Sequence, residues 1–325
     1  MRRWFVVLLV GCGACSFEHG RLSGGDGDAQ CTKPWWDASY AHRFRVDTQA
    51  PAGYTLQIDA TAVLAQSFTS SRDDVRVVVD DTIDIDRLIT GSTLELMMPA
   101  EGTVSIYTGN IAPPSPLADP SRVYRFAESF ESFAVGDNVA ARFDALPPSE
   151  WRVADDLGNH IFHAQGAARH PAAIVGMSMT DGEIRARMRW GLGGTQQHNG
   201  LAARGSNMLP ATMDGFVGQL QGDSNRTRIA EYSDGFSPPA ELTSQGFTVE
   251  RGRWYELRLR FLGDDLALVI DGTPTLATTK TGADGTHVGL YAHDCDVDYD
   301  DVRVRMYQQP EPAYTLGPDE PRCAP

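Results

Sequence analysis

Residues 252–272 read GRWYELRLRFLGDDLALVIDG, and this stretch decides the fold. Apolar and polar side chains alternate through two runs, and a turn at Gly263-Asp264-Asp265 separates the runs. Period-two alternation on both sides of such a turn is typical of a β-hairpin with one buried face. The side chains expected on the buried face are Tyr255, Leu257, Leu259, Phe261, Leu266, Leu268 and Ile270.

The same alternation recurs in short runs that turn residues separate, for example DVRVVV at 74–79, EIRARMRW at 183–190 and DVRVRM at 301–306. No stretch of note shows a helical period. We therefore predict an all-β chain, a small antiparallel β-domain followed by a β-sandwich. The expected division is a signal peptide (1–11), a tether (12–30), the small β-domain (31–113), a Pro-rich linker (114–124), the sandwich (125–308) and a tail (309–325).

Composition narrows the possible partners. The 325 residues carry a formal net charge of -15, which would repel the phosphates of nucleic acids and anionic lipid headgroups. No nucleic-acid partner is expected. Membrane association is expected only through a lipid anchor.

The N-terminus predicts export. Two arginines precede a short apolar run over residues 4–10, which is far below the roughly 20 residues that span a bilayer. The sequence Leu9-Val10-Gly11-Cys12 resembles a bacterial lipobox, which implies lipidation of Cys12. The expected location is the bacterial cell envelope, anchored to the outer membrane on its surface or periplasmic face. The alternative is an ordinary signal peptide in which Cys12 is incidental.

Export places the chain where disulfides form. Cys31 and Cys323 lie just outside the two ends of the patterned region, and a bridge between them would join the termini of the folded body. We prefer this pairing to Cys15–Cys31, although connectivity does not follow from sequence alone.

The first domain opens with a cluster of Trp, Tyr and Arg, continues with an Asp-Val-Arg strand and closes on Tyr-Thr-Gly-Asn. The residues concerned are Trp36, Tyr40, Arg43, Asp74, Arg76, Tyr107, Gly109 and Asn110. This order resembles the bacterial domain of unknown function 2341, which opens with a Trp/Tyr/Arg cluster, carries an Asp-Ile-Arg strand and closes on Tyr-Tyr-Gly-Asn. Thr108 stands where an aromatic residue is usual.

The second domain contains DGEIRAR at 181–187, WYELRL at 254–259 and YDDVRV at 299–304. In this order the segments resemble the concanavalin A-like, laminin-G-type jelly roll, in particular its carbohydrate-associated branch. Hydrolases of this fold carry Glu-x-Asp-x-x-Glu on one strand, and that motif is missing from this chain. We therefore expect no catalysis.

Glycan recognition needs an aromatic face and a few fixed polar groups. The candidate ligand-binding residues are Asn199, Arg204, Gln219, Gln221, Tyr232 and Tyr291. Trp190 shares a strand face with Ile184 and is expected in the core. The arginine rows at 185/187/189, 258/260 and 303/305 would suit an anionic polysaccharide. The preferred interpretation is pairing with Glu256 and Asp301 on neighbouring strands.

The resemblance also implies a structural calcium ion joining the first and last strands of the jelly roll. Glu131, Asp300 and Asp301 are the matching carboxylates, in keeping with the oxygen ligands that calcium prefers. The alternative is that Asp300 and Asp301 only cap a turn.

These observations together predict a lipid-anchored, non-catalytic binding protein whose sandwich recognises a glycan or another extracellular polymer. One alternative is a structural or protein-adhesion module without a small ligand. A divergent glycoside hydrolase is the other.

Lipidation is testable at one position. Replacing Cys12 with serine removes the acyl attachment point, and acyl chains supply about 0.8 kcal/mol per buried methylene. We expect Cys12→Ser to move the protein from the membrane to the soluble fraction on fractionation. Unchanged membrane retention would refute the anchor.

Overall fold

A computed structural model of the protein describes residues 35–145, 150–165, 169–208, 213–233, 239–282 and 284–322. Within these ranges the regular structure is almost entirely antiparallel β-strand, with one short helix and one 3-10 turn. None of the helices in the described ranges is long and apolar enough to cross a membrane. The predicted all-β architecture, a small β-domain followed by a β-sandwich, is confirmed.

The first domain consists of two small sheets packed face to face. One sheet has the order β21-β1-β7-β3-β4 and the other the order β2-β6-β5. Phe44 and Ile106 from the first sheet meet Leu56 and Leu94 from the second in a dry core. The elements are β1 His42–Thr48, β2 Thr55–Asp59, α1 Thr61–Leu64, β3 Arg76–Val79, β4 Ile83–Ile85, β5 Arg87–Thr90, β6 Thr93–Met97 and β7 Val104–Thr108.

The last part of the chain returns to this domain. β21 (Tyr314–Leu316) and β22 (Glu320–Pro321) pair with the two ends of β1, which corrects the expectation of a tail over residues 309–325. Glu320 accepts hydrogen bonds from Arg43 Nε at 2.8 Å and Nη2 at 2.5 Å. Strands of two and three residues are too short to show alternation, so this pairing left no pattern in the sequence.

The hairpin at 252–272 forms as predicted within the second domain. β17 (Trp254–Leu262) pairs with β18 (Asp265–Ile270), with Leu259 opposite Leu268. Both leucines are fully buried. A Cβ on Gly218 of the facing sheet would lie 2.9 Å from Leu268 Cδ1, so only glycine allows the sheets to approach this closely here.

Two long strands, β13 (Gly182–Asn207) and β20 (His287–Arg305), run through both layers of the sandwich. In the half nearest the first domain, β13 pairs with β17 and β20 pairs with β11. We call this layer the domain-facing sheet, and β8, β10, β18 and β19 complete it. In the other half, β13 pairs with β14 and β20 pairs with β12. We call this layer the distal sheet, and β9, β15 and β16 complete it.

In their described residues, the linker and the second domain contain ten further elements. They are η1 Pro120–Arg122, β8 Phe126–Glu128, β9 Phe143–Ala145, β10 Trp151–Asp156, β11 Asn159–Ala164, β12 Arg169–Ile174, β14 Asp214–Gln221, β15 Arg226–Tyr232, β16 Ala240–Gly246 and β19 Thr273–Thr279. Trp190 lies in the core between the sheets, 1% exposed, as expected.

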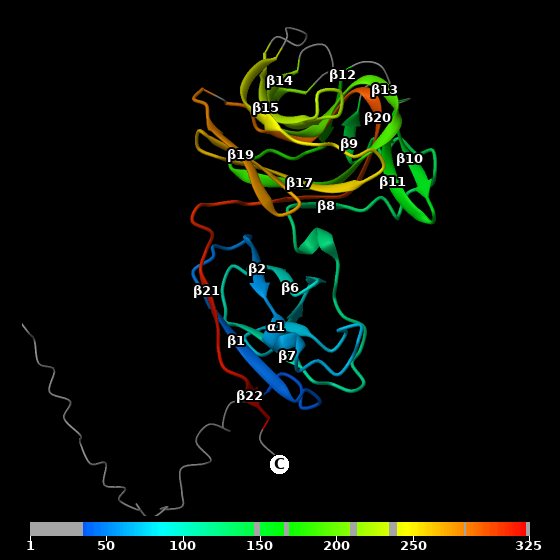
Figure 1. Cartoon of the computed structure of the whole chain (residues 1–325). Coiled ribbons are helices and arrows are strands. Elements are labelled where there is room, and N and C mark those ends of the chain that lie inside the picture. The colour runs from blue at the N-terminus through cyan, green and yellow to red at the C-terminus, as the bar shows by residue number, and fades with distance from the viewer. Residues whose placement is uncertain are drawn as a thin grey trace, which may run out of the picture.

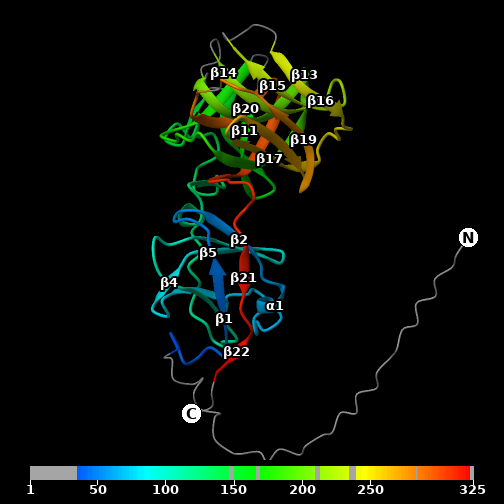
Figure 2. The same ribbon diagram turned by 90° about the vertical axis from the view of Figure 1, so that its left-hand side faces the viewer.

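The domains are stacked end to end, with the domain-facing sheet turned toward the first domain (Figure 1). The chain crosses between them twice, through η1 and again between β20 and β21. In the turned view both described chain ends lie at the end of the first domain away from the sandwich (Figure 2). Arg322 N donates to Ala41 O at 3.0 Å there, which places the C-terminal segment beside the N-terminal one.

The returning strands are expected to stabilise the first domain. Deleting residues 313–325 unpairs the edge of β1 and leaves Arg43, only 3% exposed, without Glu320. Loss of a partner for a buried charge costs about 3–5 kcal/mol, so the first domain should unfold at lower denaturant while the sandwich is unchanged.

Equilibrium unfolding followed by circular dichroism measures both transitions. Full-length Cys323→Ser is the control, because it separates any disulfide contribution from that of the strands. A first-domain transition that the deletion does not move would contradict this role of the strands.

Candidate functional site

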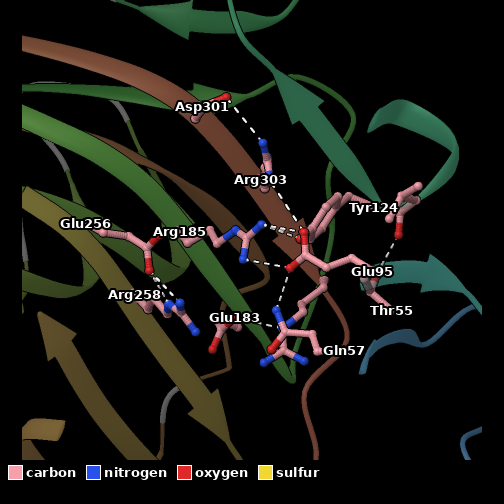
Figure 3. A network of polar contacts seen from close by, with 12 residues as sticks. Thr55, Gln57, Glu95, Tyr124, Glu183, Arg185, Glu256, Arg258, Asp301 and Arg303 are labelled. Atoms are coloured by element: carbon pink, nitrogen blue, oxygen red, sulfur yellow. Dashed lines mark hydrogen bonds and ion pairs between the residues drawn. The ribbon is translucent and has the colours of Figure 1, made fainter. Parts of the chain in front are cut away.

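The two domains meet through one buried carboxylate. Glu95 on β6 accepts two hydrogen bonds from Arg185 on β13, Nη1 to Oε1 and Nη2 to Oε2, both at 3.0 Å. Arg185 also donates to the Tyr124 hydroxyl, and Gln57 donates to Glu95 Oε1 at 2.6 Å. Arg303 of β20 lies 3.5 Å from the same carboxylate. Residues of both domains thus converge on Glu95 (Figure 3).

Burial makes this contact electrostatically demanding. Glu95 is 2% exposed and Arg185 is 8% exposed. Burial by itself raises the pKa of a carboxyl group, but the charge and hydrogen bonds of Arg185 outweigh it and keep the pKa of Glu95 below its usual value. Burial likewise raises the pKa of Tyr124, so its hydroxyl stays protonated at neutral pH. The two parallel hydrogen bonds between the Arg185 guanidinium and the Glu95 carboxylate fix the orientation of β6 against β13.

A second buried ionic group lies beside the first. Glu183 of β13 accepts hydrogen bonds from Arg305 at 2.7 Å and Arg260 at 2.6 Å. Arg305 also donates to Glu311 at 2.8 and 2.9 Å, and Tyr54 of the first domain donates to Glu311 at 2.9 Å. Burial opposes ionisation of Glu183, but the two arginines bring its pKa down to about 2. These contacts tie the segment after β20 to both domains.

An open cleft of about 310 Å³ lies beside these contacts and is lined by both domains. Its first-domain wall comes from β2 and from the β5–β6 hairpin, and its other wall comes from β13, β17 and β20. The volume is within the usual range for small-ligand sites. The lining residues are Gln57, Thr90, Thr93, Glu95, Arg185, Ala186, Arg187, Glu256, Arg258, Asp301 and Arg303.

An aromatic side chain, Trp254, lies on the same face of the domain-facing sheet as the arginines of the cleft. Trp254 of β17 lies opposite Arg189 in the β13–β17 register, two residues along from Glu256. The Arg187 and Arg189 guanidinium carbons lie 4.8 and 4.7 Å from the Trp254 ring centroid. Such stacking orients the guanidinium groups without using their N–H donors.

The arginine rows do pair with the predicted carboxylates, but the pairs form within one strand and not across neighbouring strands, because residues two positions apart share a strand face. Arg258 donates to Glu256 at 2.7 Å, and Arg303 donates to Asp301 at 3.3 Å. Arg187 donates to Asp300 at 3.3 Å but remains 42% exposed. The rows therefore form a face of alternating charge, part of which the first domain covers.

Four of the six predicted ligand-binding residues lie together on the outer face of the distal sheet. Gln219 donates to the Tyr232 hydroxyl at 2.7 Å and its oxygen accepts from Arg228 at 2.8 Å. Gln221 lies 3.5 Å from Gln219, and the Tyr232 and Tyr291 rings are 5.2 Å apart. All four predicted residues are at most 1% exposed. Ligand binding by them stays a prediction.

The other two predicted residues lie elsewhere. Arg204 donates to Thr180 O at 3.0 Å and pairs with Asp181 at 3.2 Å, beside a separate cavity of about 200 Å³. Asn199 points inward, where its amide accepts from Trp190 Nε1 at 2.6 Å in the orientation that satisfies both of its ends. Asn199 thus contacts the sandwich core, and Arg204 lies at the rim of the distal sheet.

The three expected calcium ligands each have another partner. Glu131 accepts from His160 N at 3.1 Å, Asp300 pairs with Arg187, and Asp301 pairs with Arg303. Within the described ranges, no group of three or more His, Cys, Asp or Glu side chains is placed to hold a metal ion. As placed, this donor set offers a cation few free oxygens, and calcium binding stays a prediction.

The residues that match the domain of unknown function 2341 converge in the first domain. The Asp74 carboxylate accepts from Phe68 N and Gly109 N, both at 2.9 Å. Tyr107 accepts from Trp36 N at 3.3 Å, and the Trp36 ring lies 5.4 Å from that of Tyr40. Gly109 has φ +86°, and a Cβ there would meet the His42 ring at 2.8 Å. These contacts hold the domain together.

The predicted lipidation site and disulfide fall outside the described residues. This applies to Cys12, Cys31 and Cys323 alike.

Comparisons with known proteins leave the family open. No family model matches the chain, and no curated protein matches it. Among solved structures, it is similar to the carbohydrate-binding module CBM66 from Bacillus subtilis, with 12% identity over 48% of this chain and 95% of that one and a TM-score of 0.42. The Caenorhabditis elegans galectin LEC-6 gives 14% identity over 46% and 99%, with a TM-score of 0.33.

A third similar structure is described with endo-acting O-glycanases of the human gut microbiota. It has 9% identity over 57% of this chain and all of that one, with a TM-score of 0.44. All three TM-scores are below 0.5, so these likenesses do not identify a function.

Sequence reasoning did not find the cleft, because its walls come from separate domains. The arginine rows were the one signal that pointed to it. Its first-domain residues, Gln57, Thr90, Thr93 and Glu95, belong to short strands without any motif.

The buried ion pairs of Glu183 predict that the stability of the sandwich is sensitive to acid. The pKa of Glu183 is about 2 in the folded protein against an ordinary 4.5, so its stabilisation is complete above about pH 4.5 and is lost as the pH falls toward 2. That difference corresponds to about 3 kcal/mol. We expect Glu183→Gln to lower the free energy of unfolding at pH 7 by about that amount and to flatten its dependence on pH between 5 and 2.

Denaturant unfolding across this pH range measures the effect. Glu250→Gln is the control, because Glu250 is exposed and pairs with an exposed Arg253. A Glu183→Gln profile parallel to that of the unchanged protein would contradict the assignment.

Proposed function

We propose that this protein is a non-catalytic glycan-binding protein of the bacterial cell envelope, and that it binds glycan in the cleft between its two domains. The observation that carries the proposal is the cleft itself, an open cavity of about 310 Å³ with polar groups on both walls. The predicted site on the distal sheet has comparable groups, but they are at most 1% exposed there.

The chemistry of the cleft suits sugar hydroxyls, which both donate and accept hydrogen bonds. Thr90 and Thr93 offer hydroxyl groups, Gln57 offers an amide oxygen, and Arg187 and Arg258 offer guanidinium donors. The cleft is therefore equipped for both directions of hydrogen bonding.

The walls are held in place before any ligand arrives. Glu95 and Arg185 join them through two 3.0 Å hydrogen bonds, and Tyr124 and Arg303 complete the contact. Fixing polar groups in advance lowers the entropy lost on binding. The Glu95–Arg185 pair thus supports a site that spans both domains.

The state of the cleft carboxylates supports binding without cleavage. A retaining glycosidase needs two carboxyl groups about 5 Å apart, one of them able to act as an acid. Arginines hold all three carboxylates that line the cleft, Glu95, Glu256 and Asp301. For Glu95, the charge and hydrogen bonds of Arg185 keep the pKa below its usual value, which disfavours proton donation by this carboxyl group.

The proposed location rests on the lipobox-like Cys12. Both described chain ends lie at the far end of the first domain from the sandwich (Figure 2). A tether over residues 12–30 would therefore hold the cleft and the sandwich away from the membrane. We also propose membership of the first domain in the domain of unknown function 2341 and a concanavalin A-like origin of the sandwich, on the residues that carry those resemblances.

Glycan-array binding of residues 31–325 tests the proposal. We expect binding to at least one glycan class and a loss of 10-fold or more in Thr90→Trp, because a large side chain on this exposed threonine fills the cleft. Thr273→Trp is the matched control, since Thr273 is an exposed threonine at the end of another hairpin, and it should bind normally.

Other outcomes identify the alternatives. Absence of any glycan signal would reject the proposal in favour of a structural or adhesion module. Binding that survives Thr90→Trp but is lost in Gln219→Ala would move the site to the distal sheet. Release of reducing ends from a polysaccharide panel would show a hydrolase.

A further inference from the structure

The cleft is positively charged within an acidic protein. Four arginines and three carboxylates line it, which leaves one net positive charge, whereas the whole chain carries -15. Two of the carboxylates, Glu95 and Asp301, share Arg303, and Glu95 also holds Arg185. Arg187 reaches Asp301 only at 4.0 Å and Arg258 pairs with neither carboxylate, so these two arginines are the least committed to the Glu95 and Asp301 pairs.

These two arginines are diagonal neighbours on one face of the domain-facing sheet. Arg187 lies opposite Glu256 in the β13–β17 register, and Arg258 lies opposite Arg185. Diagonal neighbours on a sheet face are about 7–8 Å apart, a span that long side chains bridge. One anionic group placed between them can therefore contact both guanidinium groups.

Both arginines keep donors available. Arg187 uses Nη1 toward Asp300 and stacks on Trp254, and the described residues provide no hydrogen-bond acceptor for its Nε and Nη2. Arg258 uses Nε and Nη2 on Glu256, and within the same described part of the chain its Nη1 has no acceptor. A guanidinium fork matches the paired oxygens of a carboxylate or phosphate group, and a sulfate group has the same tetrahedral arrangement of oxygens as phosphate.

The opposite wall supplies neutral donors. Thr90 and Thr93 face each other across the β5–β6 hairpin and line the cleft. Neither hydroxyl makes a hydrogen bond to a described residue. Their short side chains leave room beside the arginines for a sugar ring that carries the anionic group.

We infer that the cleft recognises an anionic polysaccharide, with Arg187 and Arg258 binding its carboxylate or sulfate group and the first-domain hairpin contacting the sugar. This rests on the proposed function and specifies the ligand class of the same site. Glu256 would compete with the anionic group of the ligand for Arg258, because its carboxylate lies 2.5 Å from Arg258 Nη2 and its side chain is 38% exposed.

The inference predicts opposite effects for two neutralising substitutions. Arg187→Gln removes a donor to the anion and should weaken binding about 10-fold or more. Glu256→Gln removes the competing carboxylate and should tighten binding several-fold. A defect in folding would weaken binding in both variants, so the opposite signs separate recognition from structural damage.

Titration calorimetry with defined probes makes the measurement. Polygalacturonate is compared with its fully methyl-esterified form, and dextran sulfate with dextran, so each pair differs only in the anionic group. Binding is expected for at least one charged polymer and for neither neutral one, with weakening at higher salt. Arg253→Gln is the charge-matched control, since Arg253 is exposed at the start of β17 and outside the cleft lining.

Each of the other possible outcomes would contradict a specific part of the inference or of the proposed function. Equal binding of charged and neutral polymers, unaffected by Arg187→Gln, overturns the anionic specificity and leaves glycan binding standing. Equal weakening by Arg187→Gln and Arg253→Gln shows only general electrostatic attraction and overturns the assigned pair. Failure of these probes together with an empty glycan array overturns the proposed function itself.

Discussion

The pairing of Glu95 with Arg185 is the constraint on which the arrangement of the two domains depends. Both groups are nearly inaccessible to water, so separating them would remove the main partner of a buried charge at a large cost in stability. A rotation of one domain against the other would separate them and leave both charges buried without a partner. The hydrogen bond from Tyr54 of the first domain to Glu311, whose carboxylate Arg305 of the sandwich also holds, adds the same restriction at a second point. Because the two domains supply the two walls of the cleft, these contacts determine its shape.

The fold could be predicted because it depends on local alternation. The inward side chains of residues 254–270 repeat every second position, and the hairpin forms around the predicted turn with Leu259 opposite Leu268. The outer face of the same strand was also foreseeable in part, since Arg258 does pair with Glu256. Neighbouring strands and near neighbours in sequence leave a pattern that can be read without a structure.

The interface could not be predicted because it depends on long-range placement. Glu95 and Arg185 are 90 positions apart, and nothing near Glu95 marks it as a partner. β21 and β22 are too short for alternation to show, although they complete the sheet of the first domain. The candidate ligand residues were chosen by chemical type. Gln219, Gln221, Tyr232 and Tyr291 do converge, but sequence does not reveal that they are buried.

A buried ionic interface has a consequence that an apolar one lacks. Apolar contacts tolerate small rotations, whereas a two-bond guanidinium–carboxylate contact has one favourable orientation. Because ion pairs at buried sites add little net stability, their main effect here is to select that orientation. A cleft whose walls belong to different domains needs such selection if its groups are to meet one ligand together. The arrangement of Arg187 and Arg258 opposite Thr90 and Thr93 therefore depends on the same Glu95 contact that joins the domains.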